Sequence, residues 1–209
     1  MIAWLQRHPK LRNTFIALAL LLLLDRLFPP PIPNIDADGA TIVLARDGTP
    51  LRAFANAEGV WRYPVTIEQV SPRYLEALLG YEDRWFWHHP GINPFAFLRA
   101  TAQAAWHGRI VSGGSTLTMQ VARLIEPIPH TALGKLRQMI RAVQLEIRLS
   151  KREILTLYLN LAPFGGSIEG VQAASFAYLG KPAAQLSHSE AALLAVLPQS
   201  PSRNRPDRH

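Results

Sequence analysis

Residues 81–91 of this 209-residue chain read YEDRWFWHHPG, which places two adjacent carboxylates and two adjacent histidines among several aromatic rings. A helix is expected to lead into this stretch, because Ser71 is a favourable N-cap and Pro72 a favourable first helical residue. The leucines that precede Glu82 at helical spacing are Leu75, Leu78 and Leu79. Glu82 is therefore predicted on the apolar face, where burial makes a carboxylate a better proton acceptor. A frayed helix end with Glu82 exposed is the alternative.

A second stretch, residues 113–123, reads GGSTLTMQVAR. It places a glycine pair and a capping hydroxyl before a helical run. Free backbone N–H groups at a helix start, with hydroxyls beside them, suit an anion such as a phosphate. An ordinary glycine turn with a serine cap is the commoner explanation of such a segment, and it stays open.

The composition restricts the class of partner. The chain has no cysteine, so it can form neither a disulfide framework nor a thiolate metal site. Its net charge of +7 indicates an anionic partner, for which a membrane surface or a phosphorylated lipid is a candidate. The aromatic residues do not alternate with the basic ones as in a single-strand binder, so no nucleic acid is expected. Adjacent His88 and His89 do not share a helix face, and no metal site is predicted.

The N-terminal segment has the pattern of an uncleaved signal anchor. Basic residues lie within 1–12, and an apolar run follows over 14–24. As a helix this run spans about 16 Å, against about 30 Å of hydrocarbon, so a signal-peptide core is the alternative. No small-x-small cleavage site follows it, and a stiff proline-rich spacer does. The positive charge ahead of the run predicts a cytoplasmic N-terminus.

The rest of the chain changes from β-prone to helical. Two β-prone runs, 41–45 and 51–55, flank an Asp-Gly pair, which predicts a hairpin. After residue 74 the pattern is helical almost throughout. The predicted order is a cytoplasmic tail (1–12), a transmembrane anchor (13–28), a proline-rich linker with the hairpin (29–60) and a helical catalytic domain (61–209).

Three motifs in order resemble the glycosyltransferase family 51 domain, the peptidoglycan polymerase module of class A penicillin-binding proteins. The residues that resemble its EDxxFxxHxG motif are Glu82, Asp83, Phe86, His89 and Gly91. Those that resemble its GxSTxTxQ motif are Gly113, Ser115, Thr116, Thr118 and Gln120. KREIL at 151–155 followed by YLN at 158–160 also matches. The resemblance covers about 61–206 and is most like the penicillin-binding protein 1C branch.

The resemblance implies a mainly α, lysozyme-like domain with a small β-hairpin and an N-terminal membrane anchor. It implies polymerisation of lipid II into β-1,4 glycan strands with release of undecaprenyl diphosphate. Glu82 is the predicted base for the acceptor hydroxyl. The side chains expected to bind substrate or shape its cleft are Asp83, Phe86, His89, Ser115, Thr116 and Gln120. Cations can stabilise a leaving diphosphate in place of a general acid, and the candidates are Arg123, Arg137 and Arg141.

The third motif departs from the family pattern, RKxxE, because residues 137–141 read RQMIR. The helix expected here is predicted to bury a stripe made of Leu136, Ile140, Val143 and Ile147. A neighbouring row holds Arg137, Arg141, Gln144 and Arg148, about 100° around the helix. This basic edge is predicted to line the diphosphate groove, with a solvated face as the alternative. Glu146 lies about 140° from Arg141 and is not expected to replace the missing carboxylate.

Two other functions stay open: a catalytically impaired membrane scaffold, which the altered third motif favours, and a lytic, lysozyme-like glycosidase. No Ser-x-x-Lys triplet occurs, so the transpeptidase chemistry of the family has no candidate nucleophile here. The expected partners are lipid II, the growing glycan strand, the membrane and other cell-wall synthesis proteins. The expected location is the periplasmic side of a bacterial inner membrane, with a single span. No cofactor is predicted, and a divalent cation with the diphosphate is left open.

Overall fold

The computed structural model describes residues 8–35, 40–46, 50–108, 114–201, 203 and 206. The chain forms two compact units, Met1–Pro31 and Ile32–His209. Helix α2 (Pro9–Leu27) belongs to the first. Within the ranges described, no helix combines the length and the apolar character that are needed to cross a bilayer. The anchor over 13–28 therefore stays a prediction.

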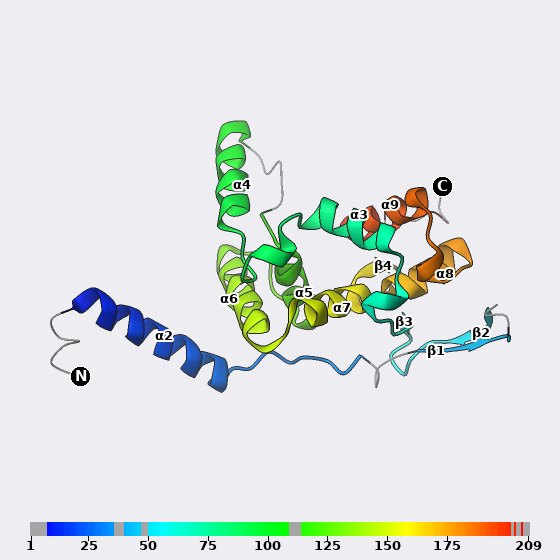
Figure 1. Cartoon of the computed structure of the whole chain (residues 1–209), viewed down its shortest axis with the longest axis horizontal. Coiled ribbons are helices and arrows are strands. Elements are labelled where there is room, and N and C mark those ends of the chain that lie inside the picture. Colours follow the sequence, from blue (N-terminus) through cyan, green and yellow to red (C-terminus); the bar gives the residue numbers. More distant parts are fainter. Residues whose placement is uncertain are drawn as a thin grey trace. The chain divides into compact units, whose positions relative to one another are not determined.

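The second unit begins with the predicted hairpin (Figure 1). Strands β1 (Thr41–Leu44) and β2 (Pro50–Phe54) pair antiparallel, with Thr41 opposite Phe54. The hairpin is confirmed, whereas its predicted Asp-Gly turn lies outside the described residues.

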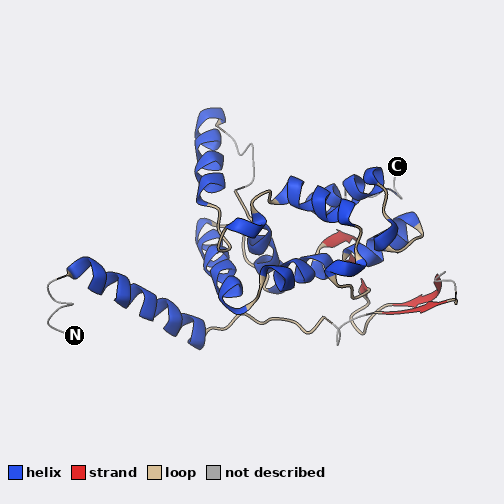
Figure 2. Ribbon diagram, viewed as in Figure 1, coloured by secondary structure: helices blue, strands red, loops and turns tan. Residues whose placement is uncertain are grey.

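The body that follows is mainly helical, as predicted (Figure 2). Its helices are α3 (Pro72–Glu82), α4 (Pro94–His107), α5 (Leu117–Ile125), α6 (Ala132–Arg148), α7 (Lys151–Leu161), α8 (Val171–Leu179) and α9 (His188–Val196). A small sheet has the order β3 (Trp61–Arg62), β5 (Ile168–Glu169) and β4 (Pro163–Gly165), with β3 parallel and β4 antiparallel to β5.

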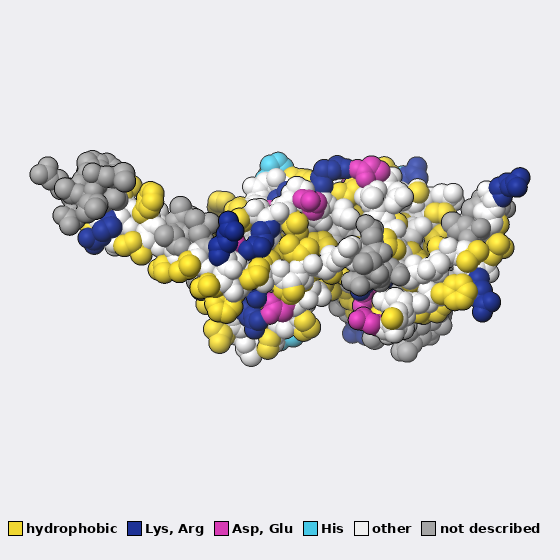
Figure 3. Space-filling model, turned by 90° about the horizontal axis from the view of Figure 1, so that it is seen from below, with side chains coloured by type: hydrophobic (Ala, Val, Ile, Leu, Met, Phe, Trp, Pro, Cys, Tyr) yellow, Lys and Arg dark blue, Asp and Glu magenta, His cyan; other side chains and the backbone are white. Residues whose placement is uncertain are grey.

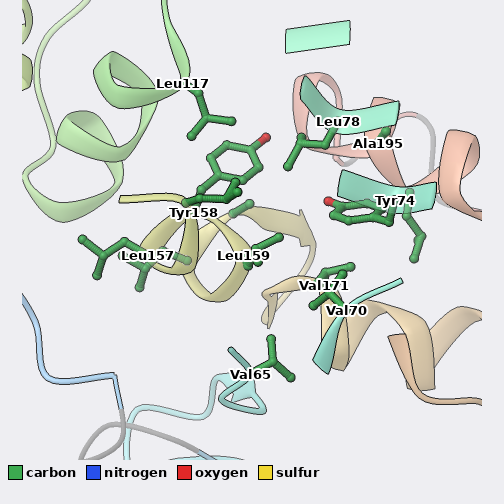
Figure 4. Packing of buried hydrophobic residues seen from close by; sticks show 14 of the residues in the cluster. Val65, Val70, Tyr74, Leu78, Leu117, Leu157, Tyr158, Leu159, Val171 and Ala195 are labelled. Carbon is green, nitrogen blue, oxygen red and sulfur yellow. The ribbon is translucent and has the colours of Figure 1, made fainter. Parts of the chain in front are cut away.

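Helix α7 passes through the centre of the core. It starts with a capping box in which Ser150 and Glu153 bond to each other's backbone N–H, so the helix begins at a defined residue. Side chains of α7 meet those of α3 and α5, as Figure 4 shows for Tyr158, Leu78 and Leu117. The core therefore joins the helix that ends at Glu82 to the helix of the second motif.

Helix α3 ends at Glu82 and packs along α9. Ser71 and Pro72 take the predicted N-cap and first positions, but the Ser71 hydroxyl donates to the carbonyl of Leu186 over 3.1 Å. It ties α3 to the segment before α9 instead of capping its own helix. The predicted capping box of Ser187 with Glu190 at the start of α9 is confirmed.

The core stripe predicted on α6 is wrong. Leu136 and Ile147 are 53% and 58% exposed, and Ile140 is exposed as well. The helix buries another face, made of Gly134, Gln138, Ala142 and Leu145, and packs it against α5 and α7. Gly134 in the first turn lies against the carbonyl of Pro129 in the segment before α6, where a Cβ would clash. Because two faces of α6 carry apolar or small residues, periodicity alone could not identify the buried one.

Candidate active site

A cleft of about 640 Å³ is lined by the last residue of α3, Glu82, which is partly buried. Two amides hold its carboxylate. Gln120 Nε2 donates to Oε2 over 2.7 Å, and Gln199 Nε2 donates to Oε1 over 3.2 Å. Gln120 lies on α5, and Gln199 on the 3₁₀ turn Leu197–Gln199 that follows α9. Glu82 is therefore neither frayed nor buried in the core, but fixed on a cleft wall.

Two buried tyrosines, Tyr74 and Tyr158, interact electrostatically with this carboxylate, and Tyr158 also lines the cleft. Figure 4 shows both rings within the core. Burial raises the pKa of Tyr74, and the negative charge of Glu82 raises it further. Burial is also the main cause that raises the pKa of Tyr158, with smaller contributions from Tyr74 and Glu82. Both phenols therefore stay neutral near pH 7. Among the described residues that line the cleft, Glu82 is the only acidic one.

Asp83 is buried and does not line the cleft. Its carboxylate accepts a hydrogen bond from Leu117 N over 2.9 Å and meets His89 Nε2 at 2.9 and 3.0 Å. Phe86 is fully buried, with Lys151 Nζ 4.5 Å from its ring centroid. These contacts fix the loop after α3 to the start of α5. Asp83, Phe86 and His89 thus lie outside the lining of the cleft, and their contacts stabilise the segments that carry the lining residues.

Thr116, not Ser115, is the N-cap of α5. Its buried hydroxyl donates to the carbonyl of Gly91 over 2.6 Å and accepts from Met119 N over 3.1 Å. The N–H groups of Leu117 and Met119 are therefore already bonded, to Asp83 and Thr116. These two N–H groups are not free for an anion, and the phosphate site predicted at this helix start stays a prediction; Gly113 lies outside the described residues.

Three cations lie at the cleft. Arg99 of α4 and Arg123 of α5 line it, and Lys135 of α6 donates to the lining residue Ser115, at its Oγ, over 2.6 Å. The side-chain carbonyl of Gln138 accepts from Arg123 Nη2 and from Lys135 Nζ, at 3.2 Å each. Burial lowers the pKa of Lys135, and the positive charge of Arg123 lowers it further. In the described ranges neither Arg123 nor Lys135 forms an ion pair with a carboxylate, so the charges of these two side chains are available to an anionic ligand.

The sequence prediction missed Lys135. The available signal was its spacing of three residues from Gln138, which places both on one face of α6. That face is the buried one, and its identity depends on the packing of α6 against α5.

The predicted basic edge of α6 does not line the cleft. Arg141 Nε lies 2.9 Å from Glu126 Oε2, and Arg137 Nη2 pairs with the other oxygen of the same carboxylate. Glu126 follows α5 directly and does not line the cleft. The diphosphate contacts predicted for Arg137 and Arg141 therefore have no support in this geometry.

The donor set of the cleft does not fit a divalent cation, because its described lining holds one carboxylate together with two arginines. In the described part of the chain, no group of three or more His, Cys, Asp or Glu residues could hold a metal ion. Glu146 bonds to Thr118 and Lys151, and it does not line the cleft. We derive no reaction step through a metal.

A largely apolar surface lies next to this site. A second cavity of about 560 Å³ is lined by Trp85, His88 and Phe95 among others, and it shares Arg99 with the first cleft. Phe95 and Trp106 of α4 are 84% and 88% exposed. Helix α4 projects from the other helices of its unit in Figures 1 and 2. Figure 3 views the molecule from the side opposite to α4, and on that face too hydrophobic side chains lie beside lysines and arginines.

Comparisons with known proteins agree with the motif pattern. A family model described as Transglycosylase matches residues 47–209. Penicillin-binding protein 1C of Escherichia coli (strain K12) is 66% identical over 184 residues, which are 88% of this chain and 24% of that protein. Penicillin-binding protein 1A of Aquifex aeolicus (strain VF5) is 40% identical over 149 residues, 71% of this chain and 20% of that protein. The chain thus spans about a quarter or less of the length of these relatives.

Proposed function

Since the chain belongs to the transglycosylase family, we propose that it is a peptidoglycan glycosyltransferase that polymerises lipid II into β-1,4 glycan strands. The observation that carries this proposal is the composition of one cleft. Its lining holds a single carboxylate, Glu82, and two arginines, Arg99 and Arg123, and Lys135 bonds to the lining residue Ser115. Arg123 and Lys135 have no carboxylate partner in the described residues. One base and an anion site are what transfer from a diphosphate donor requires.

In the proposed reaction Glu82 accepts the proton of the 4-hydroxyl of the acceptor lipid II. The hydroxyl oxygen forms a bond to the anomeric carbon of the growing chain, and the bond from that carbon to the diphosphate oxygen breaks. The diphosphate leaves with the electron pair, and direct displacement inverts the anomeric centre. Arg123 and Lys135 stabilise the charge that develops on the leaving group, so no general acid is needed.

Ser115 supports this assignment. Its hydroxyl oxygen accepts from Lys135, which leaves the hydroxyl proton free for a phosphate oxygen. Ser115 also lines the cleft, whereas Thr116 is buried and already bonded. Of the two hydroxyls predicted to bind the diphosphate, we therefore assign this contact to Ser115.

We also propose that the chain works at the periplasmic face of the inner membrane. A polyprenyl substrate stays in the bilayer, so the cleft must open close to the membrane surface. The exposed apolar side chains of α4 and α6, among them Phe95, Trp106 and Leu133, would be favoured at such an interface. The apolar run of α2 supports a single N-terminal anchor, and other cell-wall synthesis proteins are proposed partners.

The lytic alternative is less well supported. Glycoside hydrolysis uses a pair of carboxylates that flank the bond to be cleaved. Within the described lining of the cleft, Glu82 has no second carboxylate beside it. Cationic side chains lie at the cleft instead, and they suit a diphosphate better than a neutral glycan.

Incubation of the detergent-solubilised chain with labelled lipid II, followed by gel electrophoresis, tests the proposal. A ladder of longer glycan strands, with undecaprenyl diphosphate released in step, is the expected result. Shortening of preformed glycan would favour the lytic function. The absence of both reactions from a folded chain would favour the scaffold.

A further inference from the structure

The carboxylate of Glu82 is held by a side chain from the far end of the domain. Gln199 lies 117 residues from Glu82 in sequence, yet its Nε2 donates to Glu82 Oε1 over 3.2 Å. The turn that carries it is anchored by Leu197, which is fully buried. This turn follows α9 directly, and α9 packs along α3 (Figure 1). The pairing of these two helices therefore brings Gln199 to the end of α3.

Glu82 and a neighbouring tyrosine fix the orientation of the Gln199 amide. The ionised carboxylate of Glu82 can only accept, so the NH₂ group is the end that faces it, and the hydroxyl of Tyr81 donates to the remaining Oε1 over 3.0 Å. With the amide reversed, its oxygen would face the carboxylate, and Tyr81 would lose its acceptor. Two consecutive residues of α3 thus bind the two ends of one amide.

The two amides bind the carboxylate unequally. The bond from Gln120 to Oε2 is 2.7 Å, and the bond from Gln199 to Oε1 is 3.2 Å. Oε2 is therefore the more strongly bound oxygen, and Oε1 is the one with spare capacity to accept a proton.

From this geometry we propose that Gln199 is a positioning residue for the reaction: it holds Glu82 Oε1 toward the acceptor hydroxyl and stabilises the ionised carboxylate. The inference rests on the proposed role of Glu82 as the base. The acceptor O–H bond breaks, its proton passes to Oε1, and the Gln199 amide remains a donor to the same oxygen. Gln199 itself exchanges no proton.

Other charged and titratable groups also face Glu82. Tyr81 precedes it on α3, Arg99 and Arg123 line the cleft from α4 and α5, and Tyr158 faces it from α7. Tyr74 is buried nearby on α3. Of these groups only Tyr81 bonds to Gln199, so the contacts of the others do not depend on residue 199, and a change in the titration of Glu82 can be assigned to that substitution.

The test compares Gln199→Glu and Gln199→Met with Gln185→Glu, a matched change at another exposed glutamine that ends a 3₁₀ turn. The titration of Glu82 is followed by carboxyl-carbon NMR of the full chain, and its signal is assigned as the one lost in Glu82→Gln. Polymerisation of labelled lipid II is measured across pH in parallel. Because Gln199 is exposed, melting temperatures should stay within about 2 °C of the wild type.

A carboxylate at position 199 disfavours the ionised form of its neighbour. The titration midpoint of Glu82 and the acid limb of the activity profile should both move up by about one pH unit or more in Gln199→Glu. Gln199→Met should lower kcat about tenfold and change KM by less than about twofold, because it loses alignment rather than binding. Gln185→Glu should change neither quantity.

A midpoint in Gln199→Glu that equals that of Gln185→Glu would overturn the proposed contact. A shifted midpoint with an unchanged activity profile and kcat would overturn the positioning role. If the wild-type chain makes no glycan, the proposed function fails by itself, and the titration still decides whether Gln199 acts on Glu82.

Discussion

Replacement of Lys135 by methionine should remove much of the leaving-group stabilisation and leave the fold intact. Two unit charges 4 Å apart interact by about 4 kcal/mol at the effective dielectric constant of a half-buried site. Because Arg123 remains in the cleft and compensates in part, we expect a loss of about 3 kcal/mol in the transition state, or about 150-fold in kcat/KM. The stability cost should be small, since the lowered pKa of Lys135 shows that its site disfavours a charge.

Initial rates of lipid II polymerisation by Lys135→Met and Arg137→Met provide the assay. Arg137 is an exposed cation of the same helix that pairs with Glu126 outside the cleft. The wild-type rate should also fall as pH rises through the lowered pKa of Lys135, because the neutral amine no longer stabilises a diphosphate. Lys135→Met should lack this alkaline limb. A rate for Lys135→Met within threefold of wild type, with Arg137→Met strongly impaired, would refute the reasoning and restore the basic edge of α6 as the anion site.

Three further substitutions test the supporting structure. Gly91→Ala should lower the free energy of unfolding by about 2 kcal/mol, because residue 91 has φ +84° and its Cβ would lie 2.9 Å from the carbonyl oxygen of Ala142; thermal denaturation measures this. Hydrogen bonds from Lys181 and Ser187 lower the pKa of Glu190 to about 2, so its contribution to stability is present above about pH 4.5 and is lost as pH falls toward 2. The difference in melting temperature between the wild type and Glu190→Gln should therefore shrink between pH 6 and pH 3, and a constant difference would contradict this assignment. Arg141→Glu should lower the melting temperature, because it replaces the ion pair with Glu126 by two neighbouring carboxylates, while activity per folded molecule stays near wild type. A large loss of activity with an unchanged melting temperature would show that Arg141 acts in the site.

The parts of the site that could be predicted from the sequence are those set by local spacing. The spacing of four residues from Leu78 to Glu82 placed the carboxylate on one face of a helix, whereas Asp83, the C-cap of that helix, lies outside the lining of the cleft. The hairpin and the Ser187 capping box likewise depend on a few adjacent residues.

The parts that could not be predicted depend on packing between distant segments. Whether Arg137 or Lys135 lies at the cleft depends on which face of α6 packs against α5, and the hydrophobic pattern of the sequence would allow either face to be buried. The contact of Gln199 with Glu82 requires α9 to pack along α3, which no local pattern specifies. The bonded state of the α5 N-terminus depends on Asp83, more than thirty residues earlier.

The most direct test of the central claim is the initial rate of lipid II polymerisation by Glu82→Gln beside that of Glu76→Gln. Glu76 is an exposed carboxylate on the same helix, so the two variants lose the same charge in different places. If Glu82 is the base, Glu82→Gln should lose activity by about a hundredfold or more while it melts within a few degrees of wild type, and Glu76→Gln should keep the wild-type rate. Substantial polymerisation by a well-folded Glu82→Gln would contradict the account, because the described lining of the cleft offers no other carboxylate to accept the proton.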